Sequence, residues 1–347
     1  LVLSAALGKT SLVMKISNVL NAVKGKRGML LILAFYAVGM VMAQFIPTTA
    51  AISILVIFLL TLDNTGEITP KRLLLPLLGV MVGCKFRFPV GLGATTFATL
   101  NGMYEGVIGD HPEYMISMLD PFKVAIIPMI VLTVYCLFAW KLMPKEEGIN
   151  QDALKKTSTE RQLTNAQEMI VYAVFVVVML LMLLNKYTGN LLYLAPAAGV
   201  LVLIYTKVVS VPEAVKGLTA DMTWMLAGVL IVADALGSTG AGDMIGNAIL
   251  SILGENPSSM TVMFVFSFAT VIMTTFLSNM ATQSVLIPIA ASVALAAGWD
   301  PRGLVLIIGT CNYYALGFPS GSGEAAVCFA AGGYNPLKVI KFTFPYM

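Results

Sequence analysis

Long apolar stretches run through most of this chain, and they constrain its fold more than any other feature. Only 11% of the 347 residues are charged, whereas a soluble domain carries about 25%. That leaves too little polar surface to cover a globule in water, so lipid must cover much of the protein. We therefore expect an all-α polytopic membrane protein with on the order of eight to ten crossings. The candidate single spans are residues 122–141, 168–185, 190–206 and 222–236.

Two other apolar stretches each consist of two short segments that meet at a polar kink. Residues 29–62 turn at Pro47-Thr48-Thr49, and residues 260–297 turn at Ser278-Asn279. A helical hairpin that dips to mid-membrane and returns accounts for both the short arms and the polar tip. We therefore predict two re-entrant hairpins.

Two further stretches are interrupted by glycine and proline. Residues 72–108 contain Phe88-Pro89-x-Gly91-x-Gly93, and residues 302–341 contain Phe318-Pro319-x-Gly321-x-Gly323. We predict two broken transmembrane helices, because non-helical backbone at this depth persists only where protein buries it or where it lines a wet cavity. Interrupted segments at matching positions in two halves of a chain indicate the binding site of a transporter.

The two halves match at an offset of 230 residues. The paired positions are Arg72 with Arg302, Gly79 with Gly309, Thr48 with Ser278 and Thr49 with Asn279. We therefore divide the chain into a first repeat, a connector and a second repeat. The first repeat (1–141) holds the hairpin 29–62, the broken helix 72–108 and the span 122–141; the connector is 142–167; the second repeat (168–347) holds the spans 168–206 and 222–236, the hairpin 260–297 and the broken helix 302–341.

Basic residues predict the orientation. Lysine and arginine flank the first hairpin and fill the connector, whereas the flanks of the second hairpin are mainly acidic. Because basic residues mark cytoplasmic loops, the first hairpin is expected to enter from the cytoplasm and the second from outside. The repeats are then inverted, in a protein of the bacterial inner membrane. The chain begins and ends within apolar runs, so we also expect flanking helices beyond both ends.

The hairpin tips carry side chains that suit ions. A helix that starts at mid-membrane presents NH and OH donors to a carboxylate, and Thr48, Thr49, Ser278 and Asn279 lie at such starts. Hydroxyl, amide and freed carbonyl oxygens suit Na⁺. Serine and threonine also cap helices, with ~1 kcal/mol each, so capping is the alternative for any one of them.

Three charged residues lie close to the predicted breaks. Lys85 and Arg87 follow an apolar run, and a charge inside the membrane costs ~2.5–3.5 kcal/mol and is usually functional. One hypothesis is that one of them replaces sodium at the first site, which would favour anion exchange or reduced sodium coupling. The alternative is that residues 72–84 cross halfway and both charges snorkel to an interface. Glu324 is expected to pair with one of these cations or to act as a protonatable coupling group.

The second hairpin resembles the Ser-Asn-Thr motif of the divalent anion/sodium symporter family, which carries di- and tricarboxylates or sulfate. The residues concerned are Ser278-Asn279-Met280-Ala281-Thr282 and Leu286-Ile287-Pro288. The first tip lacks the asparagine, and Gly323-Glu324-Ala325 replaces the family's Pro-Pro-Asn. The resemblance covers nearly the whole chain in element order. It implies a small anionic substrate, a lipid bilayer and a homodimer as partners.

The resemblance also implies the residues of the site. For the substrate they are Ser278, Asn279, Thr282, Gly321 and Ser322, to which the first tip would add Thr48 and Thr49. For a coupling cation they are Asn279 and Gly321, together with Thr274 and Leu277 through their backbone carbonyls.

We therefore expect a secondary carrier that works by alternating access, with no cofactor and with Na⁺ as the candidate coupling ion. The chain has one histidine, no CxxC pair and no GxxxxGK[ST] motif, which argues against an enzyme and against ATP drive. Two alternatives stay open. One is another branch of the same superfamily (citrate–cation, arsenite or Na⁺/H⁺), and the other is an anion channel.

Overall fold

The computed structural model describes residues 2–11, 28–59, 67–109, 111–144, 163–183, 191–219, 221–254 and 257–347. Within these residues the regular structure is entirely helical, which confirms the all-α prediction. The α-helices are α1 (Val2–Gly8), α3 (Met29–Phe45), α4 (Thr48–Leu59), α5 (Pro70–Cys84), α6 (Thr96–Ile108), α7 (Asp120–Ala139), α8 (Asn165–Leu183), α10 (Leu191–Tyr205), α11 (Val211–Leu218), α12 (Asp221–Ser238), α13 (Ala241–Leu253), α14 (Ser259–Phe276), α15 (Asn279–Ala296), α16 (Arg302–Cys311), α17 (Gly323–Gly332) and α18 (Pro336–Tyr346). Short 3₁₀ turns occupy Gly91–Thr95, Pro112–Tyr114 and Trp140–Leu142.

Three helices of the described residues are long and apolar enough to cross a membrane. They are α7 with its following turn (Asp120–Leu142), α14 and α15. α14 and α15 have 18 residues each, or about 27 Å at 1.5 Å per residue, close to the ~30 Å hydrocarbon core. The arms of the second hairpin are therefore not short, and its re-entrant course stays a prediction.

The same order of helices occurs twice along the chain. The starts of α3, α4 and α5 are residues 29, 48 and 70, and the starts of α14, α15 and α16 are residues 259, 279 and 302. Each difference lies within two residues of the offset seen in the sequence. The inverted placement of the two copies in a membrane stays a prediction.

Each hairpin turns through one or two extended residues. Ile46 and Leu277 have extended backbone (φ −131° and −106°) and end α3 and α14. Pro47 then precedes α4, and Ser278 is the N-cap of α15, where its side chain accepts a hydrogen bond from the Ala281 N–H. The two arms of each hairpin pack against each other.

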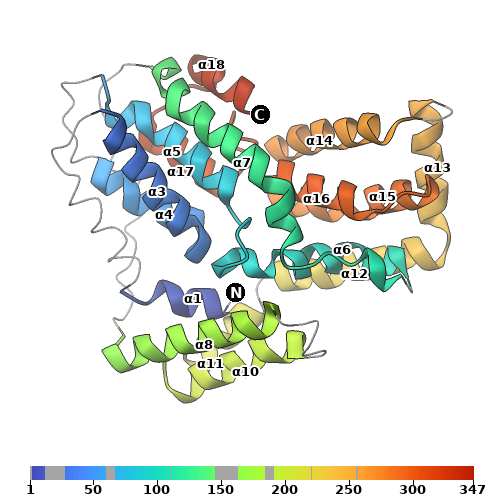
Figure 1. The fold of residues 1–347 in the computed structure, drawn as a ribbon, viewed down its shortest axis with the longest axis horizontal. Coiled ribbons are helices and arrows are strands. Elements are labelled where there is room, and N and C mark those ends of the chain that lie inside the picture. Colours follow the sequence, from blue (N-terminus) through green and yellow to red (C-terminus); the bar gives the residue numbers. More distant parts are fainter. Residues whose placement is uncertain are drawn as a thin grey trace.

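Most of the described core forms two bodies, seen at the upper left and right of Figure 1. One body holds α3, α4, α5, α7, α17 and α18, and the other holds α6, α14, α15 and α16. α12 lies along α6, and α13 packs against α15. A third group, at the bottom of Figure 1, holds α1, α8, α10 and α11.

The two halves of the chain exchange helices between the bodies. α17, from the second half, packs against α4 and α5 of the first hairpin region. α6, from the first half, packs against α15 of the second hairpin. Because the second segment of each broken helix crosses to the other hairpin, both breaks lie where the two bodies meet.

The structure differs from the sequence prediction in two segments. Residues 302–341 hold parts of three helices, because α17 ends at Gly332, its C-cap Gly333 has the left-handed conformation (φ +56°), and α18 begins at Pro336. α13 was not predicted at all. Of the connector 142–167, residues 145–162 lie outside the described residues.

Candidate functional site

The first break follows Cys84, where α5 ends and the chain turns through Lys85, Phe86 and Arg87. Phe86 has φ +58°, an uncommon left-handed conformation for a residue with a side chain. The carbonyl of Cys84 accepts a hydrogen bond (2.9 Å) from the Gln44 amide near the end of α3. The same carbonyl accepts from the Arg87 N–H (3.3 Å), so the first hairpin adds a second partner at the end of this helix.

Lys85 and Glu324 form a buried ion pair. Lys85 Nζ lies 2.5 Å from Glu324 Oε1, and the two residues are 8% and 6% exposed. The ammonium also lies 5.0 Å and 5.2 Å from the ring centroids of Phe86 and Tyr313, within cation–π range. The predicted pairing of Glu324 with a cation is therefore present, and it joins the first break to the start of α17.

Arg87 reaches the C-terminal end of α16. Its guanidinium donates to the carbonyls of Gly309 (2.9 Å) and Thr310 (2.7 Å), and the residue is 2% exposed. A cation is favoured there because the last carbonyls of a helix carry partial negative charge. Lys85 and Arg87 are thus both buried within the protein, and their depth in a membrane stays a prediction. Arg87 also differs from its expected place, since its partners belong to the second half.

Oxygen atoms gather at the second hairpin tip. Thr274 Oγ1 donates to the Asn312 carbonyl (3.0 Å) and lies 2.8 Å from the Asn279 amide. With its nitrogen turned inward, that amide donates to Thr274 Oγ1, the Gly321 carbonyl (3.2 Å) and the Asn312 carbonyl (3.3 Å). Three of the four residues predicted for a cation therefore come together. The fourth, Leu277, is exposed at the end of α14.

Some predicted site residues are buried with an unpaired polar atom. Thr48 is 2% exposed and Thr282 is fully buried, and neither hydroxyl has a hydrogen-bond partner within the described residues. The same holds for both side-chain polar atoms of Asn312. An unpaired buried hydroxyl costs ~1–3 kcal/mol. Such groups are therefore candidates to bind a ligand.

Two predicted residues cap helices. Ser278 and Ser322 accept hydrogen bonds from the N–H groups of Ala281 (3.2 Å) and Ala325 (3.1 Å). This is the alternative that the sequence left open for residues of this type. The caps fix the N-termini of α15 and α17 at the hairpin tip and at the second break.

The first tip also faces the second break. A Cβ on Gly323 would lie 3.4 Å from the Thr49 methyl group, which places Thr49 beside the start of α17. Ser320 donates to the Thr275 carbonyl (2.8 Å) and so fastens the second break to α14. Gly323 and Glu324 of α17 thus lie beside the first tip and the first break, and Ser320, just before α17, contacts the second hairpin.

Sequence reasoning missed Gln44 and Tyr313. Gln44 lies 230 residues before Thr274, and each of the two donates to a carbonyl at the end of the broken helix in its own half. The offset was visible in the sequence and would have pointed to Gln44. Tyr313 carried no such signal, because its contacts with Lys85 and Arg87 depend on tertiary structure.

Apolar helices, two hairpins and buried charges at two helix breaks define a multi-pass membrane transporter. A family model described as citrate transporter matches residues 1–309. The chain therefore belongs to the citrate transporter family and is a multi-pass protein of the cell membrane. The match supports the ion-transporter resemblance drawn from the sequence, and the subfamily stays a prediction.

Three relatives are transporters by name. A sodium-dependent dicarboxylate transporter of Staphylococcus saprophyticus is 20% identical over 96% of this chain and 69% of its own length. An uncharacterized transporter of Methanocaldococcus jannaschii is 24% identical over 70% of this chain and 57% of its own length. One of Synechocystis sp. is 25% identical over 40% of this chain and 22% of its own length. The chain thus spans only part of each relative.

Proposed function

We propose that this chain is a secondary carrier of a small carboxylate anion, with citrate as the first candidate. One observation carries the proposal. Among the described residues, two buried cations, Lys85 and Arg87, lie beside the two helix breaks with one buried carboxylate, Glu324. Two positive charges minus one negative charge leave one positive charge. Because an uncompensated charge at this depth is costly, an anion that neutralises it is stabilised there.

The neighbouring donors suit a carboxylate. The hydroxyls of Thr48 and Thr282 are buried and have no partner within the described residues. The helices α15 and α17 start at the second tip and the second break, and the N-terminus of a helix favours negative charge. In this proposal the carboxylates of the substrate accept hydrogen bonds from these hydroxyls and are attracted to the cations.

Coupling is proposed at the second tip. The Thr274 hydroxyl and the carbonyls of Asn312 and Gly321 are hard oxygen ligands of the kind that Na⁺ prefers. The Asn279 amide, whose nitrogen donates to these oxygens here, would join them by turning its own oxygen inward. At the end of α16, in contrast, the Arg87 guanidinium occupies the carbonyls of the last turn. We propose that this fixed charge stands in for one cation, so that anion exchange continues without sodium and at most one Na⁺ accompanies each substrate.

Binding to purified protein tests the proposal. Thermal unfolding is followed with citrate, succinate, malate, sulfate and NaCl, which also covers the dicarboxylate named for the relative of Staphylococcus. We expect citrate or a dicarboxylate to raise the unfolding temperature, and Asn279→Ala to abolish that rise. Asn247→Ala, at an exposed position of α13, is the matched control and keeps it. No response to any of these anions would contradict the proposal.

A further inference from the structure

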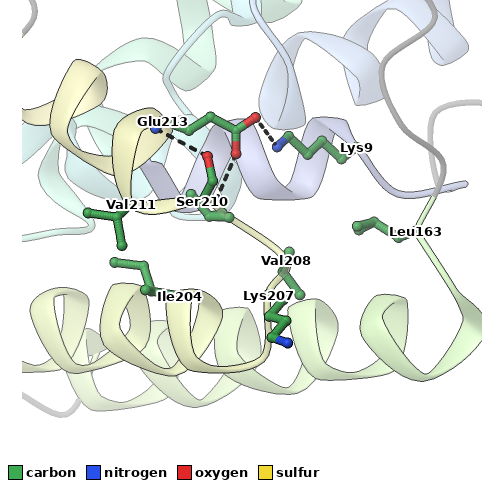
Figure 2. Close-up of a pocket in the computed structure, with 9 residues that line it drawn as sticks. Lys9, Leu163, Ile204, Lys207, Val208, Ser210, Val211 and Glu213 are labelled. Atoms are coloured by element: carbon green, nitrogen blue, oxygen red, sulfur yellow. Dashed lines mark hydrogen bonds and ion pairs between the residues drawn. The ribbon is translucent and has the colours of Figure 1, made fainter.

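A polar cavity that includes none of the hairpin-tip residues lies between α1, α10 and α11 (Figure 2). Its volume is about 500 Å³. Lys9, Lys207, Ser210 and Glu213 contribute polar groups, and the buried Val208 and Val209 contribute an apolar part. None of these residues belongs to the candidate transport site.

The cavity lies at the C-terminal end of α10. Tyr205, at the last position of α10, is 90% exposed, and Leu201 one turn earlier is 67% exposed. An exposed tyrosine at a helix end followed by a lysine is typical of a membrane–water interface. On α11, Val211 and Val215 are also exposed and share one face. The rim of the cavity thus offers apolar surface for lipid chains beside polar groups.

Lys207 has a backbone that a lysine rarely adopts. Its φ is +58°, and the N–H groups of Lys207 and Val208 donate to the carbonyls of Ile204 and Leu203. This is the Schellman end of a helix, whose left-handed position is usually glycine. A lysine accepted at this strained position indicates that its side chain has a role. Within the described residues its ammonium makes no ion pair.

The other charges facing the cavity balance each other. Lys9 Nζ lies 2.8 Å from Glu213 Oε1, and the second carboxylate oxygen of Glu213 accepts from the Ser210 N–H (2.8 Å). Figure 2 shows this chain of contacts on one wall of the cavity. With that pair neutral, Lys207 gives the lining a net charge of +1, and the Ser210 hydroxyl can donate to an anion.

We propose that this cavity binds the phosphodiester headgroup of an anionic phospholipid, with its acyl chains along the apolar rim of α10 and α11. Lys207 attracts the phosphate, and Ser210 and Lys9 donate to its oxygens. Lys207 and Lys216 are two further basic residues, which follow the predicted span that ends at residue 206. Basic residues mark the cytoplasmic side, where anionic lipids attract lysines near the surface. This site is independent of the proposed substrate site.

The test compares nanodiscs of phosphatidylcholine with and without phosphatidylglycerol. Thermal unfolding and native mass spectrometry measure stabilisation and retained lipid. We expect phosphatidylglycerol to be retained by the wild type and to raise its unfolding temperature. Lys207→Gln weakens this retention about fivefold, which corresponds to the loss of one lysine near an anionic surface.

Two further variants keep the test decisive. Lys216→Gln removes the same charge from α11 outside the cavity and retains the lipid like the wild type. Lys207→Gly relieves the backbone strain, so it is at least as stable as the wild type in phosphatidylcholine alone but still loses the lipid effect. An equal loss in Lys216→Gln, or no preference for phosphatidylglycerol, would overturn the proposal.

Soluble glycerol 3-phosphate separates a lipid from a free phosphate. We expect no shift with this compound, because it lacks the chains that cover the apolar rim; a shift equal to that of the lipid would overturn the lipid assignment. Citrate-induced stabilisation is unchanged in Lys207→Gln. Failure of this proposal is thereby distinguishable from failure of the carrier proposal.

Discussion

At the scale of single residues, the buried charges are the part of this molecule that is hardest to explain without a function. Lys85 has a carboxylate partner, Glu324, whereas Arg87 donates to carbonyl oxygens and lies over the ring of Tyr313. A simpler packing role would be filled at lower cost by apolar side chains of similar volume. The charges therefore define what the site can bind more than they define the fold.

Breaking the Lys85–Glu324 pair one residue at a time should destabilise the protein. Lys85→Met leaves a buried carboxylate unpaired, and Glu324→Met leaves a buried ammonium unpaired. Each single variant should lose about 3–5 kcal/mol of unfolding free energy, whereas the double variant should recover most of that loss. Thermal unfolding in detergent measures this. Lys123→Met breaks an exposed pair with Asp120 and should cost at most about 1 kcal/mol. A double variant as unstable as either single one would argue against a paired role.

Arg87 should depend on its planar fork as well as its charge. Lysine keeps the charge but cannot donate to the Gly309 and Thr310 carbonyls in the same geometry. We expect Arg87→Lys to bind citrate at least tenfold more weakly than the wild type, because each lost charge-assisted hydrogen bond is worth roughly 1.5–3 kcal/mol. We expect Arg87→Met to lose citrate binding. Isothermal titration measures both, and wild-type affinity in Arg87→Met would rule out the charge as a determinant of binding.

At the scale of helices, the breaks depend on close approach between backbones. Gly91 has φ +60°, and a Cβ there would lie 1.8 Å from the Gln44 carbonyl oxygen; at Gly321 it would lie 2.6 Å from the Ala315 carbonyl oxygen. Each glycine lets a break pack against polar neighbours without a side chain between them. Close backbone approach thus explains why glycine occupies both of the matching positions 91 and 321.

Gly91→Ala should therefore disrupt the first break. Both the positive φ and the overlap with Gln44 oppose a side chain, so we expect a lower unfolding temperature together with loss of transport. Gly102→Ala, inside α6 with open space around the new Cβ, should be neutral or stabilising by up to about 1 kcal/mol. Similar unfolding temperatures for the two variants would show that the break tolerates a side chain.

The link between α1 and α11 should depend on pH. The Lys9 side chain, followed by the Ser210 backbone, donates hydrogen bonds that lower the pKa of Glu213 from 4.5 to about 2. Because the folded-state pKa is depressed, the stabilisation is complete above about pH 4.5 and is lost as the pH falls towards 2. The difference in unfolding temperature between wild type and Glu213→Gln should shrink over that range. A difference independent of pH would mean that the carboxylate charge is not involved.

The ends of a helix were predicted to within one or two residues where an apolar run is bounded by polar residues. The second hairpin arms were expected at 260–277 and 280–297, against Ser259–Phe276 and Asn279–Ala296 in the structure. α13 escaped prediction because its packing is tertiary: Gly242 and Gly246 lie against Ser292 of α15, where a Cβ would be 2.6 Å and 2.8 Å from its oxygens. The partners of Arg87 were equally invisible, since more than 200 residues separate them along the chain.

At the scale of the whole molecule, the exchange of α6 and α17 between the two bodies ties both breaks to both hairpins. Because α4 packs on α17 and α15 packs on α6, a movement of one hairpin would displace the broken helix that belongs to the other half of the chain. In the carrier proposal, a transport domain made of the hairpins and broken helices moves against a scaffold made of plain spans. The expected homodimer and the inverted repeats stay predictions.

Sodium dependence separates this carrier from a sodium-driven symporter. If Arg87 supplies a fixed charge in place of one cation, counterflow of citrate in proteoliposomes should continue in sodium-free medium, with NaCl raising the rate without a steep dependence. Initial rates across NaCl concentrations measure this. A Hill coefficient near two or above would contradict the replacement of a cation by Arg87.

The central claim, that a carboxylate is bound by buried groups at the hairpin tips, is tested most directly by Thr282→Val. The hydroxyl of Thr282 is fully buried without a partner in the described residues. Its removal should therefore leave the unfolding temperature unchanged or higher, while citrate counterflow in proteoliposomes falls about tenfold or more, because a hydrogen bond to a charged group is worth about 1.5–3 kcal/mol. Thr270→Val, whose hydroxyl bonds locally to the Phe266 carbonyl, should keep counterflow near the wild-type rate. Undiminished counterflow in Thr282→Val would contradict the claim.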